Sequence, residues 1–305
     1  MAFCSCTTAF SLISTAYSFY YVNVFMNLYH IEEKWFQTAQ VLYLIWNAIN
    51  DPLFAYIQDG TNFKFTRTRR ESIKYSGPLF ALSFLLPWIP WGDNSILVGL
   101  HLVVSLFIWD TMFTFVGLAQ CALFTELSHD PSDRIKLTIY QQIGYLIGSS
   151  SVLLLEHTSD SLHDFRSFQI TAFFITICSW TLFRYTGHYA HTEYDLKKMS
   201  SLVVEENVSH NKTMEESYWK QTWQILSDKN FLSFVIANFF QEFHRTFLSN
   251  FMAILCDQLI SSQDIPQNVR KMFYGGITLM PQVKYRLFNI FLLITTFPDS
   301  GTLLY

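Results

Sequence analysis

Charged residues are scarce in this 305-residue chain, in which Asp, Glu, Lys and Arg together make up only 14%. Soluble domains are about one quarter charged, so the composition is typical of a membrane protein. The few charges show no basic surplus either, because the formal net charge is -4. A nucleic-acid partner needs a basic patch on the protein, and the sequence therefore excludes that class of partner.

Cysteine is sparse as well, with five residues whose spacing fits neither a disulfide framework nor a zinc site. We therefore expect no metal centre and no cofactor. His188 and His191 are three residues apart, but the other histidines are scattered, so a histidine-rich membrane enzyme is not expected. A cleavable signal peptide is not expected either, because the first ten residues carry no charge and the apolar run after them is long enough to cross a membrane.

Apolar segments of helical length are what the chain has in abundance, since half of its residues are hydrophobic. A helix needs about 20 apolar residues to cross the hydrocarbon core. The sequence predicts an all-α membrane protein whose spans are 8–29, 36–58, 73–91, 95–125, 138–156, 168–187 and 230–256. An eighth, poorer segment begins near Lys271.

The basic residues orient these spans, because cytoplasmic loops of membrane proteins are enriched in Lys and Arg. If the N-terminus is cytoplasmic, the outer loops between the first six spans carry only Lys34 and Arg166. The inner loops after the second and fourth spans then carry Lys64, Arg67, Arg69, Arg70, Lys74, Arg134 and Lys136. We therefore expect a cytoplasmic N-terminus, in a plasma-membrane protein whose first partner is the lipid bilayer.

The order of spans predicts three domains. Residues 1–188 form a six-helix bundle, 189–229 a polar cytoplasmic linker, and 230–305 a partial second half with an aberrant tail from 283 onward. The glycosylation sequons at Asn207 and Asn211 lie in the linker, so a cytoplasmic linker predicts that both stay unmodified. Two six-helix halves joined by an inner linker are the layout of the major facilitator transporters.

One carboxylate interrupts the second span, in the stretch "WNAINDPLFAYIQD". Asp51 shares a helix face with Asn47, four residues earlier, and nearly with Asp59, eight residues later. An ionisable residue inside a membrane indicates a functional site, and these side chains would line a cavity. The alternative is that Asp51 caps a helix break at Pro52 or pairs with a neighbouring helix.

This stretch, followed by "RTRR", resembles the second helix and following loop of the glycoside–pentoside–hexuronide:cation symporters, a branch of the major facilitator superfamily. "ALFTELSHDPSDR", Ala122 to Arg134, is similar to a second motif of the same family. The resemblance implies twelve helices, alternating access, and transport of a carbohydrate-type solute together with Na⁺ or H⁺.

The chain also departs from the family pattern at the expected cation site. Asn47 replaces a second Asp, the first span has no acidic residue, and Gly117 begins a "GLA" sequence where the family has an acidic step. Asp110 lies seven residues before Gly117 and so faces the same way. We take Asp51, Asn47 and Asp110 as the candidate cation-sensitive positions; the alternative for Asp110 is a charge at the outer rim beside Trp109.

Charged residues at the inner ends of the second and fourth spans predict a conformational latch, because a carboxylate at a helix C-terminus needs a cationic partner. The candidates are Asp59, Arg67, Arg69, Arg70, Glu126, Asp130 and Arg134. The alternative is an ordinary solvated basic loop. In the seventh span we expect Glu242 to pair with Arg245.

Two functions therefore stay open. The first is a carbohydrate-type solute:cation symporter, incomplete in this form because the second half has one or two helices. The second is a non-transporting truncated isoform or a structural membrane protein. A midplane solute site needs both halves, which is what separates the two.

Overall fold

The computed structural model describes residues 1–60, 65–92, 94–128, 130–159, 162–192, 223–224, 226–241 and 243–244. The chain divides into two compact units, Met1–Lys197 with Asn289–Tyr305, and Lys198–Phe288. In the second unit, residues 229–241 are helical. The elements of the first unit are all helical: α1 Ala2–Asn23, η1 Val24–Leu28, α2 Glu33–Gly60, α3 Arg69–Ser83, η2 Leu86–Trp88, α4 Ser95–Leu127, α5 Pro131–Ser149, α6 Ser151–Ser159 and α7 Phe165–Tyr189.

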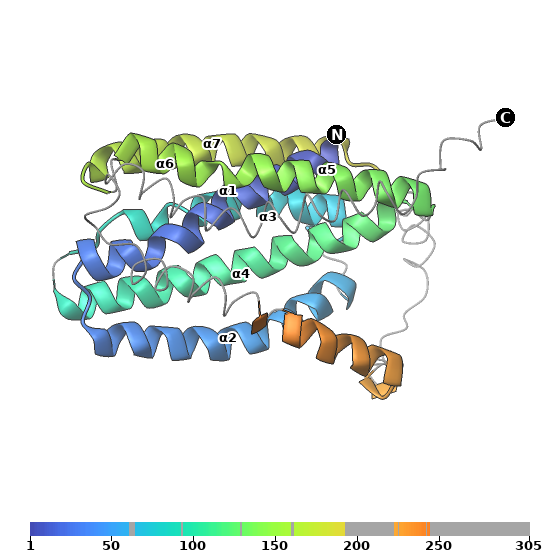
Figure 1. Ribbon diagram of the computed structural model, residues 1–305, viewed down its shortest axis with the longest axis horizontal. Helices are drawn as coiled ribbons and strands as arrows, with labels where there is room; N and C mark the ends of the chain where they lie inside the picture. The colour runs from blue at the N-terminus through green and yellow to red at the C-terminus, as the bar shows by residue number, and fades with distance from the viewer. Residues whose placement is uncertain are drawn as a thin grey trace, which may run out of the picture. The chain divides into compact units, whose positions relative to one another are not determined.

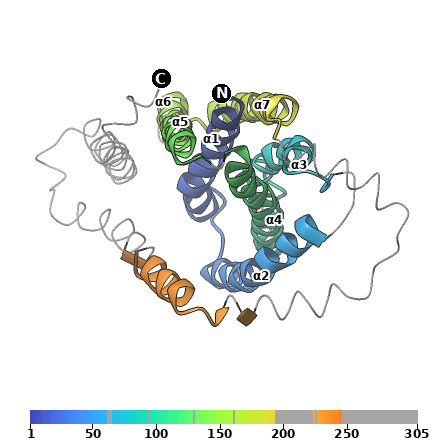
Figure 2. The same cartoon turned by 90° about the vertical axis from the view of Figure 1, so that its right-hand side faces the viewer.

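Helices α1 and α4 occupy the middle of this bundle (Figures 1 and 2). Helix α1 packs against α5, α6 and α7, and more lightly against α4. Helix α4 packs against α3 on one side and α2 on the other. Helix α2 therefore lies at the edge of the bundle, where it is held mainly through its contact with α4.

Polar side chains set the start of several helices by accepting hydrogen bonds from free backbone N–H groups. Thr68 Oγ1 accepts from Glu71 N before α3 at 3.2 Å, and Asp130 Oδ1 accepts from Ser132 N before α5 at 3.1 Å. Asp164 Oδ1 accepts from Ser167 N before α7 at 3.1 Å. The caps fall in short polar connections, which explains why the sequence pattern placed the helices near their observed positions.

Two expected spans differ from the observed helices. The third, expected over 73–91, ends as an α-helix at Ser83 and continues as the short turn η2, in a region that contains Pro87 and Pro90. Proline lacks the N–H that an α-helix needs and disfavours a helical residue before it. The fifth, expected over 138–156, is broken between α5 and α6, where the hydroxyls of Ser149 and Ser150 donate to the carbonyls of Leu146 and Ile147 at 2.9 and 2.6 Å.

The surface of the bundle is strongly apolar. Leu44 on α2 is 65% exposed and Phe174 on α7 is 64% exposed. Conversely, many hydroxyl and amide side chains are buried between helices, and Gln120 Nε2 donates to Thr7 Oγ1 at 3.0 Å. Exposed apolar residues outside and paired polar groups inside are what helices surrounded by hydrocarbon require.

Helix α4 is the one helix in the described residues that combines the length and apolar composition needed for a membrane crossing. The others carry more polar residues. Several predictions fall outside the described residues: most of the linker with its sequons, the pairing of Glu242 with Arg245, and the tail from 283.

Candidate functional site

A polar seam between α2 and α4 contains the three candidate cation-sensitive residues. Asp110 on α4 is buried, with 1% of its surface exposed. Its Oδ1 accepts a hydrogen bond from Asn47 Nδ2 at 3.0 Å, and its Oδ2 accepts one from Asn50 Nδ2. The carboxylate thus lies inside the bundle, in contact with the second helix.

Asp51 joins the same seam one turn further toward the inner end. Its Oδ1 accepts from Thr114 Oγ1 at 3.1 Å, while the same hydroxyl lies 3.4 Å from Asn50 Oδ1. Asp51 is nonetheless exposed at the bundle surface. Helix α2 runs without interruption from Glu33 to Gly60, so Asp51 does not cap a helix break at Pro52. Its hydrogen bond with Thr114 is a contact with a neighbouring helix, α4.

Two residues of the seam, Asn50 and Thr114, were not singled out from the sequence. Both are readable in hindsight from helical spacing, because Asn50 follows Asn47 by three residues and Thr114 follows Asp110 by four. Together with Asn47, Asp51 and Asp110 they form what we call the mid-helix cluster. The sequence has no Lys or Arg from 35 to 63 or from 75 to 133, and Lys34 at the start of α2 lies thirteen residues before Asn47, so neither helix places a Lys or Arg close to the cluster.

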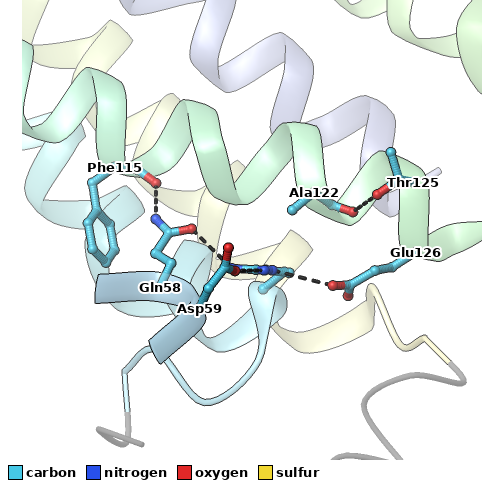
Figure 3. Close-up of polar contacts among 7 residues, drawn as sticks. Gln58, Asp59, Phe115, Ala122, Thr125 and Glu126 are labelled. Carbon is cyan, nitrogen blue, oxygen red and sulfur yellow. Dashed lines mark hydrogen bonds and ion pairs between the residues drawn. The ribbon is translucent and has the colours of Figure 1, made fainter. Parts of the chain in front are cut away.

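A second cluster lies at the C-terminal ends of the same two helices, which the basic residues predict to be the inner ends. Arg69, at the start of α3, pairs with the carboxylate of Asp59, and its Nε lies 3.3 Å from Glu126 Oε1 on α4. Its Nη1 donates to Gln58 Oε1 at 3.4 Å. Figure 3 shows Gln58, Asp59 and Glu126 converging between the ends of α2 and α4. We call Asp59, Arg69 and Glu126 the inner ion-pair cluster.

The inner ion-pair cluster is partly buried, with side-chain exposures of 17% for Arg69, 15% for Glu126 and 59% for Asp59. Burial alone would lower the pKa of the Arg69 guanidinium. The hydrogen bond and charge of Asp59, together with those of Glu126, outweigh that effect and raise the pKa above its ordinary value. Arg69 is therefore a permanent cation that ties α2, α3 and α4 together.

Two of the remaining latch candidates have local contacts near the start of α5. Asp130 caps α5, and Arg134 Nε donates to the carbonyl of Ser128 at 3.0 Å. Arg70 is half-buried at the start of α3, and Arg67 forms no ion pair with another residue in the described part of the chain. Among the seven candidates, the structure brings Asp59 and Glu126 together through Arg69.

Comparison with known proteins places these clusters in a family. The profile of the MFS/sugar transport proteins matches residues 3–255. Transmembrane protein 180 of the chicken, Gallus gallus, is 28% identical over 275 residues, which are 83% of this chain and 53% of that protein. Transmembrane protein 180 of the mouse, Mus musculus, is 27% identical over 275 residues, 82% of this chain and 52% of that protein.

The chain spans about half the length of these curated relatives. The phrases "NDPLFAYIQD", "FLLPWIPWG" and "GLHLVVSL" in this sequence suggest a resemblance to transmembrane protein 180, and the comparison confirms that resemblance. No solved structure matches the chain. The family match covers most of the sequence, including both clusters and the two motifs, and the chain therefore belongs to the MFS/sugar transport family of integral membrane proteins.

Proposed function

We propose that this chain forms the N-terminal six-helix half, and one or two helices of the C-terminal half, of a secondary transporter for small polar solutes of the carbohydrate type. The observation that carries the proposal is the mid-helix cluster. It places two carboxylates, Asp51 and Asp110, between two helices of a family whose members move solutes across membranes. Ionisable side chains at such depth mark solute or ion pathways in membrane proteins.

Coupling to Na⁺ or H⁺ follows from the charge of the cluster. Two carboxylates in adjacent helices are stabilised by a proton or a bound cation, and the one Lys or Arg in these two helices is Lys34, at the far start of α2. A proton neutralises a carboxylate directly. A sodium ion, like other hard cations, binds oxygen ligands, and the cluster offers oxygens of Asp51, Asp110, Asn50 and Thr114.

The inner ion-pair cluster is suited to the conformational change that transport requires. Alternating access needs an element with two stable arrangements, and ion pairs between helix ends that repack are one such element. In this proposal the contacts of Arg69 with Asp59 and Glu126 form when the inner end is closed and separate when it opens. The N-terminus and residues 189–229 then face the cytoplasm, and the protein functions in the plasma membrane.

A non-transporting membrane protein is the second candidate, and one observation favours it. Both oxygens of Asp110 already accept amide hydrogen bonds, from Asn47 and Asn50. A cluster satisfied in this way also serves as packing between two helices.

Uptake by cells that express a complete carrier with this chain as its N-terminal part separates the two functions, because a midplane solute site needs both halves. Radiolabelled hexoses, pentoses, glycosides and hexuronates are offered with and without an inward Na⁺ or proton gradient. The proposal expects accumulation of at least one of these solutes, driven by one gradient and absent in cells without the chain. Uptake of none of them above background contradicts it and leaves the non-transporting role.

A further inference from the structure

The side chain of Gln58 connects two helices and the inner ion-pair cluster at once. Gln58 is buried, with 1% of its surface exposed. Its Nε2 donates to the backbone carbonyl of Phe115 on α4 at 2.7 Å, and its Oε1 accepts from Arg69 Nη1 at 3.4 Å. Figure 3 shows the amide reaching from the end of α2 to the Phe115 carbonyl. One side chain thus links the middle of α4 to the cation at the start of α3.

The two contacts fix the orientation of the amide. A glutamine amide has one accepting oxygen and one donating nitrogen. If the group were turned over, its NH₂ would face the guanidinium of Arg69 and its oxygen would face the Phe115 carbonyl. Donor would then face donor and acceptor would face acceptor, so only the observed orientation satisfies both neighbours.

Phe115 lies directly after a residue of the mid-helix cluster. Thr114, the residue before it, donates to Asp51 in the mid-helix cluster. Any shift of α4 against α2 that changes the Thr114 contact also moves the Phe115 carbonyl, because the two residues are adjacent in one rigid helix. The displacement reaches Arg69 through a buried side chain that has a single satisfactory orientation.

We propose that Gln58 is a positioning residue that couples the mid-helix cluster to the inner ion-pair cluster. The hydrogen bonds of the mid-helix cluster fix the position of α2 against α4. Because Gln58 contacts both α4 and Arg69, a change in that position alters the contacts of Arg69. The idea rests on the proposed function only for its biological purpose, since the coupling itself is a property of the folded chain. Such coupling is demonstrated when the effect of one substitution depends on whether a second substitution is present.

The test measures the accessibility of the inner end without measuring transport. Thr125 is an exposed residue beside Glu126 at the inner end of α4, and Thr125→Cys gives a reporter thiol in a full chain whose five native cysteines are replaced. The rate of labelling by a water-soluble maleimide is measured with and without Asp110→Asn. An asparagine at this position puts an NH₂ against one of the two amide donors, so α2 should loosen from α4 and Arg69 should release the inner end.

Asp110→Asn should raise the labelling rate about fivefold or more when Gln58 is present. Gln58→Glu keeps an acceptor for Arg69 but faces the Phe115 carbonyl with a second acceptor, so it breaks only the link to α4. In that background, Asp110→Asn should change the rate little. Gln58→Leu removes both contacts at similar volume and should behave in the same way, which guards against one variant that fails to fold.

Gln37→Glu is the matched control, because Gln37 is an exposed glutamine on α2 whose side chain donates to Glu33 of the same helix. It should leave the effect of Asp110→Asn unchanged. The proposal is overturned if Asp110→Asn accelerates labelling equally with Gln58, Gln58→Glu and Gln58→Leu, or if it has no effect with Gln58 present. Failure of solute uptake alone would count against the proposed function and would leave this coupling intact.

Discussion

Asp110 illustrates, at the scale of single residues, how this chain places an acidic group inside a bundle. The side-chain amides of Asn47 and Asn50 both donate to the carboxylate. Such donors replace the water that the group loses on burial, and an unpaired buried polar group is costly. The stability of the α2–α4 contact therefore depends on the acceptor at position 110.

Asp110→Ala should lower the apparent free energy of unfolding by about 1–3 kcal/mol for each amide left without its acceptor. The readout is the apparent Tm of the detergent-solubilised chain. Asp133→Asn is the control, because Asp133 forms only an exposed pair with Lys136 on α5 at 3.0 Å, worth under about 1 kcal/mol. Equal shifts of the apparent Tm in the two variants would show that the buried Asp110 contacts stabilise the chain no more than the exposed pair does.

The cap of α7 predicts a dependence on pH. Hydrogen bonds from the side chain and backbone of Ser167 hold the pKa of Asp164 below its ordinary value of 3.8. Because the folded pKa is the lower one, the cap contributes its full stability above the ordinary pKa and loses it as the pH falls through the folded pKa. Asparagine caps helices about as well as aspartate but does not titrate.

Asp164→Asn should therefore match the unmodified chain at about pH 6 and lose less of its apparent Tm than that chain on acidification to about pH 3. Parallel melting curves over this range check the prediction. Identical losses in the two chains would mean that the ionised cap adds no stability.

Single residues were predictable from the sequence where helical spacing was the only information needed. Asn47 and Asp51 share a face by their spacing of four, and both contact α4. Asp110 kept two interpretations, because spacing does not report how deep a residue lies. Gln58 was missed, since its partner is the backbone carbonyl of Phe115. Every residue has a backbone carbonyl, so the sequence does not show which one accepts a side-chain hydrogen bond.

At the scale of helices, the contact between α1 and α5 is close enough to exclude a side chain. A Cβ atom added to Gly148 would lie 2.3 Å from Ser11 Cβ and 2.8 Å from Leu12 N. The approach is stabilised by hydroxyl donors on both sides, Ser11 Oγ to the Tyr145 carbonyl at 3.1 Å and Ser151 Oγ to the Leu12 carbonyl at 2.8 Å. Small residues at helix contacts are a common feature of membrane proteins.

Gly148→Ala should destabilise the chain by about 1–3 kcal/mol, because the added methyl group forces α1 away from α5. Gly117→Ala is the matched control on α4. There the new Cβ would meet the ring of Phe10 at 3.7 Å, an ordinary contact, and alanine is the better helix former by about 1 kcal/mol. A Gly148→Ala variant that melts at or above the temperature of Gly117→Ala would refute the close contact.

Helix positions were largely predictable from the sequence, because apolar runs bounded by polar capping residues report where helices start. Helix interruptions were less so. The break between α5 and α6 depends on serine hydroxyls that turn back to their own helix, and serine is equally able to continue a helix. The early end of α3 at Ser83 was readable from Pro87 and Pro90, but the hydrophobic run around them favoured a longer span.

At the scale of the whole molecule, the exposed apolar faces and the family place the chain in a membrane, and the basic residues predict its direction. The sequons at Asn207 and Asn211 give a test that needs no labelled substrate. Glycosidase treatment of the chain from mammalian cells should produce no mobility shift. A shift that is lost in Asn207→Gln with Asn211→Gln would invert the orientation, since glycans are attached only on the lumenal side.

The central claim is that the mid-helix cluster is the cation-sensitive centre of a solute carrier. Its most direct test is the gradient dependence of solute uptake by a complete carrier that contains this chain as its N-terminal part. The carrier is compared in three forms: with Asp51→Asn, with Asp133→Asn, and unmodified. The account predicts that Asp51→Asn removes the response to Na⁺ or pH while the amount of folded protein at the membrane stays the same, and that Asp133→Asn keeps it. An unaltered response in Asp51→Asn would contradict the account.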